Sequence, residues 1–231
     1  MRRSRLASIV LGLLLGLLIA VTSAAGSGHK GPPGSGHKGP PGKHGNAQGK
    51  GHGKTDSNAR LRWDIIHLST LPPPTTTLPG GTASACAASS CANMITLTGS
   101  GTFRSNSGRP QDVAGGGMWT TTGFGAGSGT YKVTGFVSFV LAPGNLPSPP
   151  FTDGVTGVAA DARAGLAVLR IAYSDGDNGV LVLSCDLPGT PSNLPIFEGI
   201  TASKGFIDYW NHQAPMSVAP FGNRTAFHVV H

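Results

Sequence analysis

Apolar and polar side chains alternate along the C-terminal part of the chain, and this alternation constrains the fold more than any other feature. It is clearest between Thr130 and Ala142. The apolar residues at odd positions there are Tyr131, Val133, Val137, Phe139 and Leu141. Successive side chains of a strand point to opposite faces, so a period of two predicts a strand with these five residues on one face.

Similar runs, separated by clusters of Gly, Pro, Asn and Asp, continue from Met94 to the end of the chain. They are residues 94–103, 115–122, 166–173, 180–185, 196–201, 205–210 and 224–230. Between two of them, Ser174 to Gly179 has the composition of a hairpin turn. No segment has a clear helical period. The sequence therefore predicts an all-β domain over residues 94–231, an antiparallel β-barrel of about eight strands of the calycin or dirigent type.

Residues 1–25 have the three-part pattern of a secretory signal. A basic start (Arg2, Arg3 and Arg5) is followed by an uncharged apolar run from Ile9 to Val21 and by small residues up to Ala25. The run is shorter than the roughly 20 residues that span a bilayer, which favours cleavage over an uncleaved anchor. We expect a secreted or extracytoplasmic protein that is not an integral membrane protein after cleavage.

Residues 26–59 form a low-complexity tail rich in Gly, His, Lys and Pro, with too few apolar side chains to build a core. Seven of the 17 basic residues lie between residues 26 and 62, whereas residues 95–231 carry seven Lys or Arg and eight Asp or Glu. The folded part thus lacks the basic surface of a nucleic-acid-binding domain. We expect a disordered tail, whose charge could bind an envelope or matrix polyanion.

The tail holds four histidines, each near a lysine: His29, His37, His44 and His52. Histidines in Gly-rich repeats bind Cu(II), Ni(II) or Zn(II) weakly, so a weak metal site is one interpretation. The other is a solvated spacer that needs no ligand. The chain contains no phosphate loop or dinucleotide fingerprint, and we expect no cofactor.

Residues 60–93 are predicted to be a linker, because they contain a Pro/Thr tract from Leu71 to Thr82 and two close cysteines. The three cysteines are Cys86, Cys91 and Cys185. In an oxidising compartment, one pair can form a disulfide and one thiol is left over. The pair could be Cys86 with Cys91, or Cys185 with either of them.

Few charged residues interrupt the predicted strands, and these are the candidate site residues. Glu198 is the only glutamate of the chain, and its pKa would be raised if it faced a barrel interior, where it could act as an acid or a base. Arg170 shares a face with Leu166 and Val168, and an inward arginine would need a carboxylate partner or an anionic ligand.

His228 lies within the last predicted strand, where a structural histidine is the alternative to a catalytic one. We take Glu198, Arg170 and His228 as candidate catalytic residues. The candidate ligand-binding residues are Arg170, Glu198 and Tyr173.

Three segments carry a resemblance to known proteins: FEGITASKGFIDYW (Phe197–Trp210), NRTAFHV (Asn223–Val229) and AGLAVLRIAYSDG. Together they resemble a family of uncharacterised, secreted, β-rich proteins of bacteria and fungi, over roughly residues 95–231. This resemblance implies a secreted β-rich domain and carries no activity. The Phe-Glu-Gly strand is also distantly similar to the allene-oxide-cyclase and dirigent-like barrels, which implies a barrel and nothing about chemistry.

Two functions remain open from the sequence. The first is a non-enzymatic barrel that binds a small apolar ligand or works as a surface module. The second is a small barrel enzyme of the isomerase or cyclase type that acts on an apolar substrate. Convergence of Arg170, Glu198 and His228 in one inward cavity would favour the enzyme.

Overall fold

The computed structural model describes residues 59–105, 112–193 and 196–231, and the structural statements below concern these residues. The predicted signal, the tail apart from Ala59, and the four tail histidines lie outside them. The predictions about disorder, signal cleavage and metal binding in those segments stay predictions.

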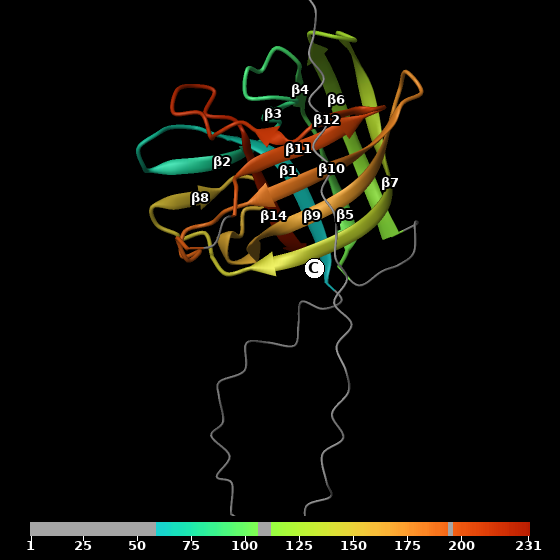
Figure 1. Ribbon diagram of the computed structural model, residues 1–231. Coiled ribbons are helices and arrows are strands. Elements are labelled where there is room, and N and C mark those ends of the chain that lie inside the picture. The colour runs from blue at the N-terminus through green and yellow to red at the C-terminus, as the bar shows by residue number, and fades with distance from the viewer. Residues whose placement is uncertain (1–58, 106–111, 194–195) are drawn as a thin grey trace, which may run out of the picture. The chain divides into compact units, whose positions relative to one another are not determined.

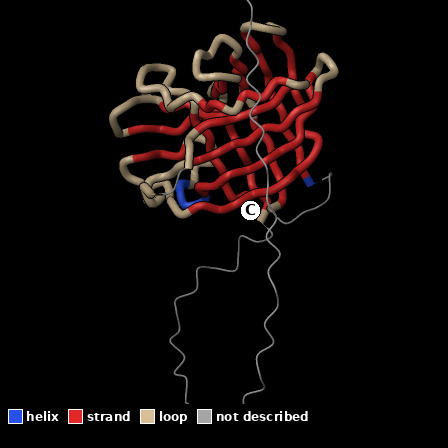
Figure 2. Tube along the Cα trace, viewed as in Figure 1, coloured by secondary structure: helices blue, strands red, loops and turns tan. Residues whose placement is uncertain are grey.

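Six strands close an antiparallel barrel (Figures 1 and 2). They are β1 (Arg60–Leu68), β5 (Ser100–Arg104), β6 (Val113–Thr122), β7 (Gly127–Ala142), β9 (Ala162–Tyr173) and β14 (Arg224–Val230). The ring runs β1, β5, β6, β7, β9, β14 and back to β1, with hydrogen-bonded neighbours at every step. The predicted all-β antiparallel barrel is confirmed.

Eight further strands extend this ring. They are β2 (Thr75–Pro79), β3 (Ala83–Cys86), β4 (Met94–Leu97), β8 (Phe151–Asp153), β10 (Asn178–Cys185), β11 (Gly199–Lys204), β12 (Ile207–Tyr209) and β13 (Asn211–His212). β10, β11 and β12 continue the sheet beyond β9, and β4, β3 and β13 continue it beyond β6. β2 pairs with the end of β1 and, in parallel, with β8, at the left of the barrel in Figure 1. No helix in the described part of the chain is long and apolar enough to span a membrane.

The predicted linker 60–93 is wrong, because this segment supplies three strands, of which β1 is a member of the closed ring. β1 is buried on both faces. Trp63 and Ile65 are fully buried in the main core, and Asp64 and Ile66 on the opposite face are also buried. A strand covered on both sides does not alternate between apolar and polar residues, which is why the period of two failed to reveal it.

The barrel is filled by side chains. Trp63, Phe103, Leu169 and Phe227 are fully buried in one continuous core. The ring centroid of Phe103 lies 5.1 Å from that of Phe136 and 6.2 Å from that of Phe227. Protein interiors are close-packed, and the large aromatic rings of this core are in contact with one another. The interior of the barrel is therefore occupied by side chains.

Two β-bulges interrupt β7, one between Val133 and Gly135 and one between Phe136 and Ser138. Each bulge shifts the pairing with β9 and changes which side chains face the core. Tyr131 and Val133 are buried as predicted, but Val137 and Leu141 are 48% and 49% exposed. The prediction that all five apolar residues share the inner face is therefore wrong for these two.

Cys86 and Cys91 form a disulfide, and Cys185 is a buried free thiol at the end of β10. Of the pairings left open by the sequence, the structure thus contains the one between Cys86 and Cys91, which closes a short loop between β3 and β4. A disulfide is compatible with an oxidising compartment outside the cytoplasm.

Candidate functional site

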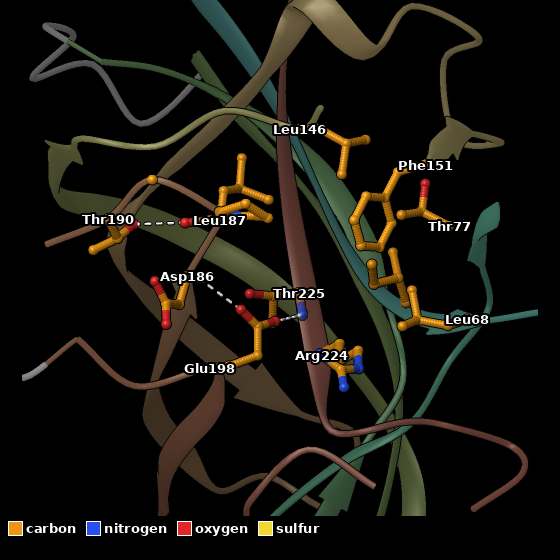
Figure 3. A pocket seen from close by; sticks show the side chains of 13 residues that line it. Leu68, Thr77, Leu146, Phe151, Asp186, Leu187, Thr190, Glu198, Arg224 and Thr225 are labelled. Atoms are coloured by element: carbon orange, nitrogen blue, oxygen red, sulfur yellow. Dashed lines mark hydrogen bonds between the residues drawn. The ribbon is translucent and has the colours of Figure 1, made fainter. Parts of the chain in front are cut away.

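A cavity of about 380 Å³ lies against the outside of the barrel wall, between β14 with the end of β1 on one side and the segments 146–151 and 186–190 on the other (Figure 3). We call it the Glu198 cavity. Its apolar wall is made by Ile66, Leu68, Leu146, Phe151 and Leu187. Its polar side chains are those of Thr77, Asp186, Thr190, Glu198, Arg224 and Thr225. The volume falls within the range of small-molecule sites.

Glu198 is held by the backbone of two strand ends. Its Oε2 accepts a hydrogen bond from the backbone N–H of Asp186, just after β10, and its Oε1 accepts one from the backbone N–H of Thr225 in β14, each at 2.6 Å (Figure 3). The next residue, Gly199, has a φ of +117°, a conformation that favours glycine, where the chain enters β11. Glu198 therefore has one fixed position in the cavity wall.

Burial raises the pKa of Glu198 to about 8. The two backbone N–H groups and the charge of Arg224 act in the opposite direction and do not cancel the loss of water. At neutral pH the carboxyl group is therefore mainly protonated. A protonated carboxyl can donate a hydrogen bond and still accept others.

Arg224 lines the same cavity at the start of β14. Its Nε is buried and has no hydrogen-bond partner among the described residues, nor does the guanidinium form an ion pair with any of them. A buried donor without an acceptor is costly, and a charge without a partner is more so. Arg224 is therefore the group in this cavity with the largest unsatisfied binding capacity.

The threonine hydroxyls around the cavity are already engaged. Thr225 Oγ1 donates to the carbonyl of Ser184 at 2.6 Å, Thr77 Oγ1 donates to Asp153 at 3.1 Å, and Thr190 Oγ1 donates to the carbonyl of Pro143 at 2.7 Å. These hydroxyls hold the surrounding segments in place, and their donor hydrogens are already used. Recognition in the cavity is left to Arg224 and Glu198.

Of the four residues predicted from the sequence, only Glu198 lines this cavity. Arg170 is exposed on the outer face of β9, opposite Gly135 and Val180. It does share a face with Leu166 and Val168, but that face points away from the core. Tyr173 is buried elsewhere, and its hydroxyl donates to the carbonyl of Ser203 at 2.8 Å.

His228 is buried in β14 in contact with Asp153, with 3.3 Å between its Nε2 and Asp153 Oδ1. Burial lowers the pKa of His228, although the charge of Asp153 opposes this shift. Asp153 also accepts bonds from the backbone N–H of Val155 at 3.0 Å and from the Thr156 hydroxyl at 2.6 Å. These contacts hold the turn after β8 against the barrel wall. His228 and Asp153 therefore have a structural role.

Sequence reasoning missed three groups that matter here. Arg224 appeared only as the first residue of the last predicted strand and within the NRTAFHV segment, and Asp64 and Asp153 carried no signal because each lies alone in its segment. Asp64 forms a two-pronged ion pair with Arg62, at 2.7 Å to each oxygen. Asp64 and its partner Arg62 are two residues apart in one strand, whereas Asp153 and its partner His228 lie in different strands. The sequence does not show which of these acids is buried, and only the fold reveals it.

No group of three or more His, Cys, Asp or Glu side chains that could hold a metal ion occurs within residues 59–105, 112–193 and 196–231. No protein-family model, curated protein or solved structure matches this chain. The resemblances inferred from the motifs therefore stay predictions, and the function has to be argued from the Glu198 cavity.

Proposed function

We propose that this chain is an exported, non-enzymatic protein that binds a small, mainly apolar ligand in the Glu198 cavity. The observation that carries the proposal is the cavity itself, which combines an apolar wall with Arg224, whose buried Nε has no acceptor among the described residues. Small-molecule sites are typically apolar hollows with a few polar groups that orient the ligand. The signal pattern and the Cys86–Cys91 disulfide support export.

The proposed site differs from the one that the barrel class suggests. In hollow barrels the ligand occupies the interior, whereas here Trp63, Phe103 and Phe227 occupy it. The ligand would instead lie against the outer wall, under the segments 146–151 and 186–190. The tail remains a second proposed contact, with an envelope or matrix polyanion.

The alternative is an isomerase or cyclase that acts on an apolar substrate. It is favoured by one observation, the pKa of Glu198 near 8, which suits a general acid or base. The other two residues expected to assist, Arg170 and His228, lie outside this cavity. The convergence that would favour an enzyme is not found among these three residues, and we prefer the binding function.

The test uses N-phenyl-1-naphthylamine, an uncharged probe whose fluorescence rises in apolar surroundings. We expect saturable binding of one probe per chain, weakened at least tenfold by Leu146→Trp, since the larger ring would fill the cavity. Val140→Trp on the exposed outer face of β7 is the matched control and should leave binding unchanged. Circular dichroism checks that each variant is folded. Equal affinity of a folded Leu146→Trp variant would contradict the proposal.

A further inference from the structure

We propose that the ligand of the Glu198 cavity is a carboxylate-bearing amphiphile, whose acid group binds Arg224 and Glu198 and whose short alkyl or aryl part lies against Leu68, Leu146 and Phe151. This inference rests on the proposed binding function and adds the chemical class of the ligand. It starts from the charge that the cavity leaves uncompensated.

Arg224 is the positive group of the cavity wall. Its Nε is buried without an acceptor, and no carboxylate of the described chain lies within ion-pair distance of its guanidinium. A guanidinium presents a planar set of N–H donors that matches the two oxygens of a carboxylate. An anionic ligand would supply both the missing acceptor and the missing charge.

Glu198 adds a second contact for the same acid group. Its two oxygens are fixed by the N–H groups of Asp186 and Thr225, so its carboxyl cannot turn to pair with Arg224 without losing them. Because burial keeps this carboxyl mainly protonated near neutral pH, it can donate a hydrogen bond to an incoming carboxylate. Two carboxyl groups that share a proton can lie close together, whereas two ionised ones would repel.

The charge balance favours a monoanion. Asp186 lines the cavity with an exposed side chain, where water screens its charge. Its repulsion would be felt most by a doubly charged group such as a phosphate monoester. A cationic amphiphile would meet Arg224 with the wrong sign, and an uncharged one would leave its guanidinium without a counter-charge.

The arrangement of the wall gives the ligand a direction. In Figure 3, Leu146, Phe151 and Leu68 lie on one side of the cavity, and Glu198 and Asp186 lie on the other with Leu187 beside them. A ligand with an acid group at one end and an apolar part at the other matches this division. The cavity volume of about 380 Å³ suits a short chain or a single ring system rather than a membrane lipid with two long chains.

The experiment measures displacement of N-phenyl-1-naphthylamine from the full chain by octanoate, octanol and octylamine at pH 7. We expect octanoate to bind at least tenfold more tightly than either of the others, the size of effect that one charge-assisted contact produces. Arg224→Gln should lower the affinity for octanoate about tenfold or more and leave octanol within twofold. Arg170→Gln, which removes an exposed arginine from β9, is the matched control and should change neither.

Each outcome decides a separate point. If octanol displaces the probe as well as octanoate does, or octylamine binds best, the inference is overturned and the proposed binding function stands. If neither the probe nor octanoate, followed directly by calorimetry, binds at all, the proposed function fails as well. Should Arg224→Gln not fold, Arg224→Lys keeps the charge and loses the planar pair of donors. Undiminished octanoate binding by that variant would also count against the inference.

Discussion

In the described part of the chain, Asp64 and Asp153 are buried and Glu198 is half-buried, and each carboxyl group is accommodated in a different way. Asp64 pairs with Arg62 through two bonds of 2.7 Å, although burial still raises its pKa. For Asp153, burial is outweighed by bonds from Thr156 and Val155 and by the charge of His228, which lower its pKa to about 2. Glu198 has only backbone partners and a pKa near 8. Asp64 and Asp153 are thus each in contact with a basic side chain, whereas Glu198 forms no ion pair with a described residue.

Glu198 should make the stability of the protein depend on pH in a defined direction. Its pKa is about 8 in the folded chain and near the ordinary value of 4.5 in the unfolded chain. The unfolded chain therefore loses this proton first as the pH rises. The stabilisation is full below about pH 4.5 and is lost progressively up to about pH 8. Glu198→Gln should remove this loss.

The measurement is urea unfolding of the parent chain and of Glu198→Gln between pH 5 and 8.5. The groups close to Glu198 are the buried thiol of Cys185, whose pKa burial raises, the carboxyl of Asp186 and the guanidinium of Arg224. His228 has a lowered pKa, so it makes stability rise with pH below its ordinary pKa of 6.5. Both proteins contain His228, so the difference between their pH profiles isolates Glu198. Identical pH profiles would show that Glu198 is already ionised in the folded state.

Asp153 should be a stabilising residue. Asp153→Ala would leave His228 buried without its partner and release the bonds to Val155 and Thr156. Because the lowered pKa of His228 leaves it neutral at pH 7, the change is a loss of buried hydrogen bonds, which should cost about 2–4 kcal/mol in the free energy of unfolding. Urea unfolding at pH 7 measures the change, with the exposed Asp208→Ala as the control, for which we expect less than about 0.5 kcal/mol. A loss below about 1 kcal/mol for Asp153→Ala would refute this role.

At this scale the sequence revealed part of the site. It identified Glu198 as an isolated carboxylate in an apolar run, and the structure places it in a cavity. It placed Arg170 on the face of Leu166 and Val168, but a period of two does not say which face is inward. Arg224 could not be found in advance, because its significance is the lack of a partner, which depends on residues far apart in the chain.

At the scale of elements, the hairpin of β9 and β10 was the most predictable part. Its two alternating runs and the turn between them coincide closely with the observed strands. β4 and β5 were expected as one strand from Met94 to Phe103, and the chain instead turns between Leu97 and Ser100. The strands missed altogether were β1, β2, β3, β8 and β13. Four of these five have five residues or fewer, too short for a period to be recognised.

β1 should be indispensable for folding. It pairs with both β14 and β5, and Trp63 and Ile65 are fully buried in the core. A chain that begins at residue 59 should therefore unfold in a single cooperative transition, whereas one that begins at residue 83 should show none, because the ring would be open. Differential scanning calorimetry of the two truncations compares them. A cooperative transition of the shorter chain, at a similar temperature, would contradict this account of β1.

At the scale of the whole molecule, the packed core and the proposed binding cavity lie on opposite sides of one wall. The inner face of β1 and β14 contributes Trp63 and Phe227 to a filled core, and the outer face contributes Leu68 and Arg224 to the Glu198 cavity. The strands thus form a rigid support for a site that lies outside the barrel. Residues of the segments 146–151 and 186–190 line that cavity from the other side.

This division predicts that core and cavity variants have separable effects. Phe103→Ala removes a fully buried ring that contacts Phe136, Phe139 and Phe227, and should lower the free energy of unfolding by about 3–5 kcal/mol. Phe103 does not line the Glu198 cavity, so the affinity for N-phenyl-1-naphthylamine should stay within twofold under conditions where the variant is folded. Urea unfolding and fluorescence titration give the two values. If Phe103→Ala abolished probe binding while the chain remained folded, the probe would occupy the interior of the barrel, and the outer cavity would lose its assigned role.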